Sequence, residues 1–262
     1  MLDVSLRNLG FTYPKSGFAL RGITIAFEKS THTAIVGPPS CGATTLLRLV
    51  AGTLQPDEGE IAIGARLVNG VKAARRPLLF ATSAIDAPPR WSVQHALIAA
   101  VRKRTLDRQD RELEYDLAVA KWRLEKLVTR RLDTLSTAEQ TLAHLASIEL
   151  LRPGILVADR LLERLPEASD DFYRTMRVIG TTVISAPASH GELGTTNAIA
   201  VLESGRLIQT GSIAEVFAKP ASEAAAAATG DANVIPIEIR GTVVESPIGA
   251  WDVAGAPFQG TG

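Results

Sequence analysis

A glycine-bounded loop between an apolar strand and an apolar helix constrains the fold of this chain most. The apolar segment HTAIV leads directly into the loop GPPSCGATT, and the chain then continues as TTLLRLVAG. Gly37, Gly42 and Thr44 stand at the offsets of the phosphate-binding pattern G-x-x-x-x-G-K-[ST], but Ala43 holds the lysine position. A buried strand that enters such a loop and then a helix predicts an α/β fold with a parallel core sheet.

The rest of the chain alternates between strand and helix patterns. Residues 3–13 and 22–30 alternate like strands, residues 56–69 are typical of a hairpin, and residues 153–159, 181–186 and 198–212 predict further strands. Residues 93–132 are helical in pattern and highly charged, which predicts an exposed helical subdomain. Ser136, followed by Glu139 three residues later, predicts a helix start with a capping box.

Composition excludes some classes of function. Among 262 residues, 28 basic and 28 acidic side chains give zero formal net charge, so we expect no nucleic-acid partner. The single cysteine, Cys41, rules out an intrachain disulfide and is typical of a reducing compartment. The N-terminus has no secretory pattern and no apolar run reaches 18 residues, so we expect a cytoplasmic location.

Five segments in this order resemble the ATP-binding subunit of an ABC transporter. Besides the loop, Tyr13 in FTYP is similar to the family's adenine-stacking ring, and LSTAEQ, with Ser136, is similar to its LSGGQ signature. Asp159 follows Leu135 by 24 residues, the family's spacing from signature to Walker B aspartate. Residues 201–220 resemble the family's closing strand, turn and helix.

The resemblance implies a P-loop NTPase fold of ABC type, in which a parallel core sheet is joined by an antiparallel β subdomain and a helical subdomain. It implies an ABC-type nucleotide-binding domain at residues 1–218, with the helical subdomain at about residues 91–150. A linker at 219–231, whose small residues are also typical of a short helix, and a partial OB-like β segment at 232–262, which resembles that of importers, follow.

The resemblance also implies a binding site for ATP and Mg²⁺. Thr44 and Asp159 would hold the metal. Because Pro38 and Pro39 supply no N–H donors and no lysine is present, we expect weak nucleotide binding or none. The implied nucleotide-binding residues are Tyr13, Gly37, Ser40, Cys41, Gly42, Ala43, Thr44, Thr45 and Ser136.

No catalytic residue is expected, because other residues hold the family's catalytic positions. Ala43 stands for the lysine, Arg160 for the glutamate after the Walker B aspartate, and Ala188 or Pro187 for the switch histidine. The Q-loop glutamine, the two signature glycines and the D-loop aspartate are also replaced, by Ala81 or Thr82, by Thr137 and Ala138, and by Pro166 respectively. Loss of a general base costs a factor of about 10²–10⁴ in rate, and loss of a charge-stabilising donor about 10²–10³. These changes predict a pseudo-ATPase.

Several residues leave alternatives open. Arg160 either supplies the missing positive charge or forms an ion pair with Asp159 that blocks the metal position, and we favour the ion pair. His190 is either a displaced switch histidine or a surface residue, and we favour the surface residue. The charged run from residue 102 to residue 131 either docks on a membrane subunit or is a solvated helical face.

The preferred function is that of an ABC transport subunit on the inner face of the cell membrane, with weak or no ATP hydrolysis. Its expected partners are transmembrane permease subunits and a second ATP-binding subunit, identical or different. A non-transport scaffold or regulator that reuses the fold as an interaction surface is the first alternative. An active ATPase that uses unfamiliar groups is the second.

Overall fold

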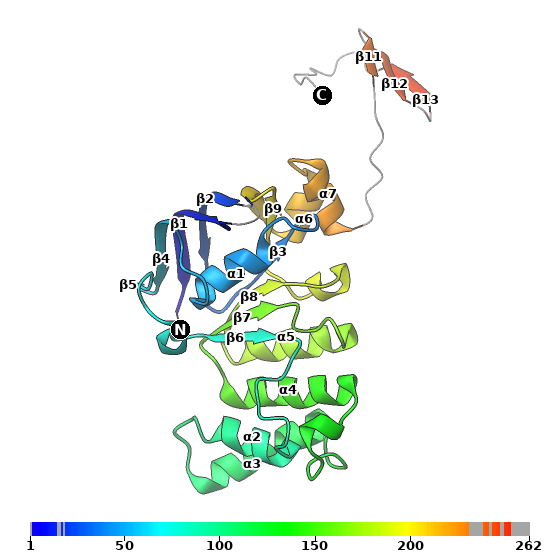
Figure 1. Ribbon diagram of the computed structural model, residues 1–262. Coiled ribbons are helices and arrows are strands. Elements are labelled where there is room, and N and C mark those ends of the chain that lie inside the picture. Colours follow the sequence, from blue (N-terminus) through cyan, green and yellow to red (C-terminus); the bar gives the residue numbers. More distant parts are fainter. Residues whose placement is uncertain are drawn as a thin grey trace. The chain divides into compact units, whose positions relative to one another are not determined.

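The structure is a computed structural model that describes residues 2–14, 17, 19–230, 238–240, 243–246 and 249–252. The chain divides into two compact units, residues 1–229 and 230–262 (Figure 1). The centre of the first unit is a six-stranded sheet in the order β10-β9-β3-β8-β7-β6, parallel except for β10. Its strands are β3 (His32–Val36), β6 (Leu79–Thr82), β7 (Ile155–Asp159), β8 (Thr182–Ala186), β9 (Ala198–Glu203) and β10 (Arg206–Gly211).

A second, antiparallel sheet in the order β2-β1-β4-β5 belongs to the same unit. Its strands are β1 (Val4–Thr12), β2 (Ala19–Phe27), β4 (Glu58–Ile63) and β5 (Arg66–Leu67). Their buried apolar side chains join those of helix α1 (Ala43–Ala51) and of the six-stranded sheet in one hydrophobic cluster. This packing fixes α1, and therefore the loop that precedes it, against two sheets.

The remaining helices of the core stack on the side of the sheet opposite α1. Helix α5 (Ser169–Val178) lies near β8, α4 (Thr137–Leu151) packs on α5, and α2 (Val93–Val101) and α3 (Arg108–Lys121) pack on α4 (Figure 1). Strand β7 contributes to both hydrophobic clusters, because its residues alternate between the two faces of the sheet. The carboxyl ends of β7 and β8 are thereby held rigidly beside the start of α1.

Two short helices complete the first unit. Helix α6 (Ile213–Ala218) and helix α7 (Glu223–Thr229) pack against β9 and share a small apolar cluster with β3. Residues 219–231, which the sequence predicts to be a linker or a short helix, therefore include a packed helix.

The second unit contains an antiparallel sheet of β11 (Glu238–Arg240), β12 (Val243–Ser246) and β13 (Gly249–Asp252). Most of the predicted OB-like segment at 232–262 lies outside the described residues.

The predicted fold class is confirmed: an α/β unit with a largely parallel core sheet, a separate antiparallel sheet and a helical region. The predicted start of α4 is confirmed as well. Ser136 caps the helix, its side chain accepts from the Glu139 N–H, and the Glu139 carboxylate accepts from the Ser136 N–H at 2.7 Å. Among the described residues, no helix is long and apolar enough to cross a membrane.

Candidate functional site

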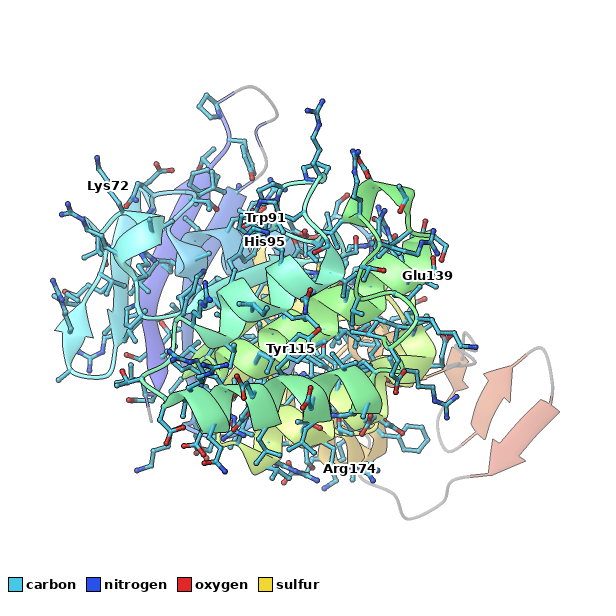
Figure 2. The ribbon with its side chains drawn as sticks, turned by 90° about the horizontal axis from the view of Figure 1, so that it is seen from below. Lys72, Trp91, His95, Tyr115, Glu139 and Arg174 are labelled. Atoms are coloured by element: carbon cyan, nitrogen blue, oxygen red, sulfur yellow. The ribbon has the colours of Figure 1, made fainter. Side chains whose placement is uncertain are left out.

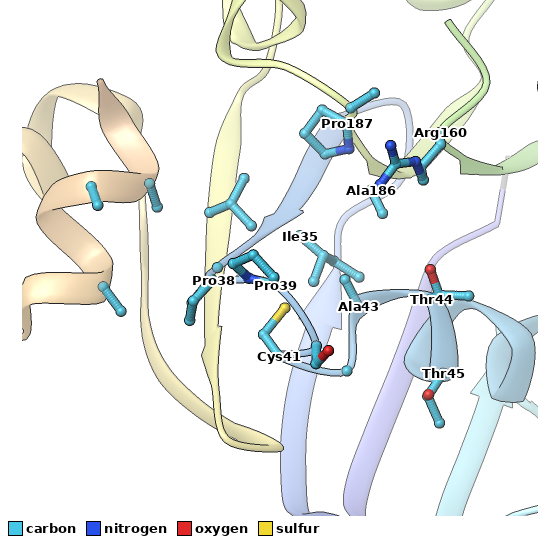
Figure 3. Close-up of a pocket in the computed structure, with 18 of the residues that line it drawn as sticks. Ile35, Pro38, Pro39, Cys41, Ala43, Thr44, Thr45, Arg160, Ala186 and Pro187 are labelled. Carbon is cyan, nitrogen blue, oxygen red and sulfur yellow. The ribbon is translucent and has the colours of Figure 1, made fainter. Parts of the chain in front are cut away.

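A cavity of about 860 Å³ opens where the loop after β3 meets the loop after β8 (Figure 3). The loop Gly37–Gly42 and the first turn of α1 form one side. Arg160 and residues 186–190 form a second side, and alanines of α7 line a third. Of the residues that the sequence singles out, the cavity is lined by Tyr13, Gly37, Ser40, Cys41, Gly42, Ala43, Thr44, Thr45, Arg160, Pro187, Ala188 and His190.

The loop needs glycine at its first position. Gly37 has φ of 154°, and a Cβ atom there would lie 2.0 Å from the Leu202 carbonyl oxygen. Gly42, at the N-cap of α1, has φ of 108°, in the left-handed region that disfavours other residues. The two glycines of the motif therefore allow a sharp backbone path against β9.

The start of α1 presents main-chain donors to the cavity. The first helical hydrogen bond runs from the Leu46 N–H to the Gly42 carbonyl at 2.9 Å, so the N–H groups of Ala43, Thr44 and Thr45 precede the helical ladder. Such a helix end favours an anion. The loop itself offers fewer donors, because the Cys41 N–H already bonds to the Pro38 carbonyl at 3.0 Å and prolines have none.

Cys41 is a buried packing residue of this loop. Its side chain belongs to the cluster between α1 and the sheets, and burial raises the pKa of its thiol, which opposes formation of a reactive thiolate.

Thr44 and Asp159 meet behind the loop. The Thr44 hydroxyl donates to Asp159 Oδ1 at 2.9 Å, although the residues are 115 positions apart. Asp159 ends β7 and is only 7% exposed, so its carboxylate is held in place. A hydroxyl and a carboxylate are the protein groups that P-loop proteins use to hold magnesium beside the phosphates, and these two fit that role. Among the described residues no cluster of three or more metal-binding side chains exists, and a P-loop magnesium site needs none.

The predicted ion pair between Arg160 and Asp159 is wrong. Arg160 Nη2 lies 2.8 Å from Glu163 Oε1, and its Nε lies 3.3 Å from Glu163 Oε2. This two-point contact raises the pKa of Arg160 and lowers that of Glu163, with the hydrogen bond as the main cause in each case. Because the turn after β7 brings Glu163 back toward Arg160, Asp159 keeps its bond to Thr44.

The loop after β8 carries no residue suited to activate water at the predicted switch position. Pro187 and Ala188 line the cavity, and His190, which starts a short 3-10 turn, lies further along the same wall. Glu192 is almost fully buried, and its Oε1 accepts from the Ala188 N–H at 2.8 Å and from the Ser189 N–H at 3.2 Å. Burial is the main cause that raises the pKa of Glu192. The Glu192 carboxylate therefore holds the backbone of this loop in place.

A buried polar cluster lies beneath β8. His32 Nε2 and the Ser185 hydroxyl are 2.8 Å apart, and the ring centroids of His32 and Tyr173 are separated by 4.3 Å. Burial lowers the pKa of His32 to about 3, so the ring is neutral at physiological pH. Burial also raises the pKa of Tyr173. The residues of this cluster do not line the cavity, but they support strand β8, which leads into its wall.

The predicted signature residue Ser136 does not line this cavity. It lies exposed at the N-terminus of α4, followed by the exposed Thr137 and Ala138. In one copy of the chain, therefore, Ser136 is separate from the other predicted nucleotide-binding residues.

A second hollow of about 530 Å³ lies between β6 and helices α2 and α4. Thr82, at the predicted Q-loop position, lines it together with Trp91 and His144. The Trp91 ring stacks on His95 with 4.3 Å between centroids (Figure 2). Burial lowers the pKa of His144 to about 4, while Asp86 acts in the opposite direction. The hollow is mainly apolar, with Asp86 and Lys103 as its charged residues.

Sequence reasoning missed the two glutamates that organise the cavity wall. Glu163 follows Arg160 by three residues, a spacing at which opposite charges meet in a helical turn. That spacing was a usable signal. Glu192 gives no comparable signal, because its burial depends on the tertiary packing of the turn against the core.

Comparison with known proteins places this geometry in a family. The sequence matches the ABC transporter family over residues 20–161, more than half of the chain. It is 28% identical over 251 residues to the molybdate/tungstate import ATP-binding protein WtpC of Thermococcus kodakarensis, with 89% of this chain and 74% of that one covered. It is 28% identical over 249 residues to the sn-glycerol-3-phosphate import ATP-binding protein UgpC of Rhodopseudomonas palustris, which covers 92% and 68% respectively.

Solved structures share the fold. The protein cbiO1 from Clostridium perfringens, part of the ABC transporter complex cbiONQ, superposes with a TM-score of 0.70 at 23% identity, covering 82% of this chain and 90% of that one. A bacterial Atm1-family ABC exporter with ATP bound gives a TM-score of 0.71 at 23% identity, covering 84% and 40%. At this identity the likeness concerns the fold alone.

Proposed function

This chain belongs to the ABC transporter family, and we propose that it is the ATP-binding subunit of an import complex whose own site holds nucleotide weakly and hydrolyses it little or not at all. The family binds ATP with Mg²⁺, and the similar curated proteins are named as import ATP-binding proteins. The proposed binding residues are those that line the cavity, together with Asp159.

One observation carries the proposal. The Thr44–Asp159 pair that can hold magnesium keeps a 2.9 Å hydrogen bond, whereas Ala43, Arg160 and Ala188 bring no general base and no loop cation to the phosphates. The site therefore has groups that can bind a nucleotide but lacks the groups that would catalyse its hydrolysis. Phosphoryl transfer depends on placed charges and an oriented water, so a cavity that keeps the cradle but has no general base at the predicted positions supports binding better than turnover.

We further propose partners for the subunit. It would lie on the inner face of the cell membrane with transmembrane permease subunits, and would pair with a second ATP-binding subunit, identical or different. The mainly apolar hollow beside Thr82, Trp91 and His144 supports a protein contact at this face of the helical region. In a dimer, the exposed Ser136 would be available to the partner's cavity.

Co-purification tests this function. The chain would be tagged and isolated from detergent-solubilised membranes, with Trp91→Ala as a variant of the hollow and exposed Leu67→Ala as a matched control. The expected result is that permease subunits accompany the wild type and the control and are depleted with Trp91→Ala. Recovery of only non-transport proteins would contradict the transport assignment and favour the scaffold alternative.

A further inference from the structure

The cavity contains one permanently charged cation. Of its lining residues, all within the described part of the chain, Arg160 is the only arginine or lysine. In Figure 3 the Arg160 side chain lies across from the loop, on the side of Ala186 and Pro187. The cation that the phosphate-loop motif places at position 43 is missing there, while a cation stands on the facing wall.

Arg160 is not free to act at rest, because Glu163 holds it. The fork of the guanidinium meets the two carboxylate oxygens at 2.8 and 3.3 Å. The side chains of Arg160 and Glu163 are 55% and 45% exposed. An ion pair that is this open to water contributes little stability, so a competing anion of higher charge can replace the carboxylate at small cost.

Phosphate is such an anion. A guanidinium binds phosphate with the same two-point geometry that it uses for carboxylate. The short turn between Arg160 and Glu163 keeps their side chains together. Arg160 therefore lies within reach of both the Glu163 carboxylate and the cavity. The start of α1 would hold the remaining phosphate oxygens through its main-chain donors.

We infer that Arg160 is the phosphate-binding cation of this site and that Glu163 competes with the terminal phosphate of a nucleoside triphosphate for it. The inference rests on the proposed function, because it assumes that the cavity admits a nucleotide. Glu163 then acts as a built-in inhibitor of binding. Arg160 is a binding residue here, since its guanidinium would touch the phosphate.

The test is a double-mutant cycle on ATP binding. Titration calorimetry with Mg·ATP would compare the wild-type full chain with Arg160→Gln, Glu163→Gln and the double variant. Exposed Arg174→Gln and Glu167→Gln serve as matched controls for the loss of one charge of each sign. Thermal melts would verify folding, which should be unaffected because Arg160 and Glu163 are exposed.

We expect Glu163→Gln to tighten ATP binding at least fivefold and Arg160→Gln to weaken it at least tenfold. The double variant should match Arg160→Gln, because Glu163 acts only through Arg160. ATP binding by Glu163→Gln alone, with none by the wild type, would equally support the exchange. The two controls should bind like the wild type.

The opposite results would overturn the inference. One is that Arg160→Gln binds ATP as tightly as the wild type. Another is that Glu163→Gln raises ATP affinity equally whether or not Arg160 is replaced. The third is that no variant binds ATP at millimolar concentration. Equal affinity for inorganic phosphate and ATP would overturn the assignment to a nucleotide. If Ala43→Lys binds ATP tightly while Arg160→Gln changes nothing, the exchange fails and the proposed function stands. If the exchange holds but no permease subunit co-purifies, the proposed function fails alone.

Discussion

The two sides of the cavity differ in how closely their residues match the family pattern. On the loop side, Gly37 and Gly42 keep the backbone path, and Thr44 keeps its bond to Asp159. On the facing side, Arg160 and Ala188 stand where the family resemblance places a glutamate and a histidine. The proposed function therefore treats the main-chain cradle as retained and the side chains that would perform chemistry as replaced.

The difference has a physical cause. The loop is part of the fold, because Gly37 must lie against the Leu202 carbonyl and the start of α1 joins the core shared by two sheets. Replacing these residues would destabilise the protein. Arg160 is exposed and the small Ala188 side chain is only half-buried at the cavity, so side chains on the facing side can change without loss of the fold. Retained geometry on the loop side is therefore weak support for catalysis.

The largest expected effect concerns two buried histidines, one beneath the facing side of the cavity and one beside the second hollow. His32 lies beneath β8 with a folded-state pKa of about 3, and His144 has one of about 4, against about 6.5 when unfolded. At these two sites the unfolded chain therefore binds more protons below pH 6.5, so the contribution of the two histidines to stability falls as pH drops from 6.5 toward their folded values. The pair should together cost about 4 kcal/mol between pH 7 and pH 5.

Urea unfolding at the two pH values checks this loss. His32→Gln, which cannot become charged, should reduce the loss of unfolding free energy between pH 7 and pH 5 by about 2 kcal/mol. The same reduction in the exposed variant His95→Gln would show that burial of His32 is not the cause.

The next largest effect concerns the loop side of the cavity. If the loop is an intact cradle that lacks only its cation, Ala43→Lys should tighten Mg·ATP binding about thirtyfold, since a charge-assisted hydrogen bond contributes about 1.5–3 kcal/mol. Calorimetry measures this, with Ala65→Lys as a control for a surface charge added away from the cavity. An unchanged affinity would mean that the cradle itself is lost.

A smaller effect is expected from the bond that joins the loop side to β7. Thr44→Val removes the hydroxyl that donates to the buried Asp159 carboxylate, which should cost about 1–2 kcal/mol of unfolding free energy. Thr44→Ser, which keeps the hydroxyl, should retain most of the stability. Destabilisation by Thr44→Ser but not by Thr44→Val would show that the methyl group matters and the hydrogen bond does not.

The smallest effect concerns the signature serine, which lies outside the cavity. Ser136→Ala should cost about 1 kcal/mol of stability, because it removes the cap of α4. In a single copy of the chain it should leave ATP affinity unchanged. Weaker ATP binding by the monomeric variant would contradict the separation of Ser136 from the site.

The sequence predicts much of the fold, because local patterns match it. The strand before Gly37, the capping box at Ser136 and the hairpin at residues 56–69 all form as predicted. Strand β6 and helix α5 were missed. Strand β6 has only four residues, and α5 begins with the polar residues SDD and has a short apolar face of Phe172, Tyr173 and Met176.

The candidate site was less predictable, because its contacts join distant segments. Motif spacing indicated the loop residues and Asp159, but the partner of Arg160 was predicted wrongly. The three-residue spacing allows Glu163 to meet Arg160, but the positive φ of Arg160, 51°, which begins the turn that brings Glu163 into reach, was not evident from the sequence. The role of Glu192 depends on burial, which only the assembled core provides.

One measurement tests the central claim, that the site retains a nucleotide cradle without hydrolysis. Mg·ATP binding and phosphate release would be measured on the same preparation of the pure chain. The account predicts Mg²⁺-dependent binding, with phosphate release no faster than in buffer. Steady phosphate release that Asp159→Asn abolishes would contradict it, because the residues on the facing side would then support turnover.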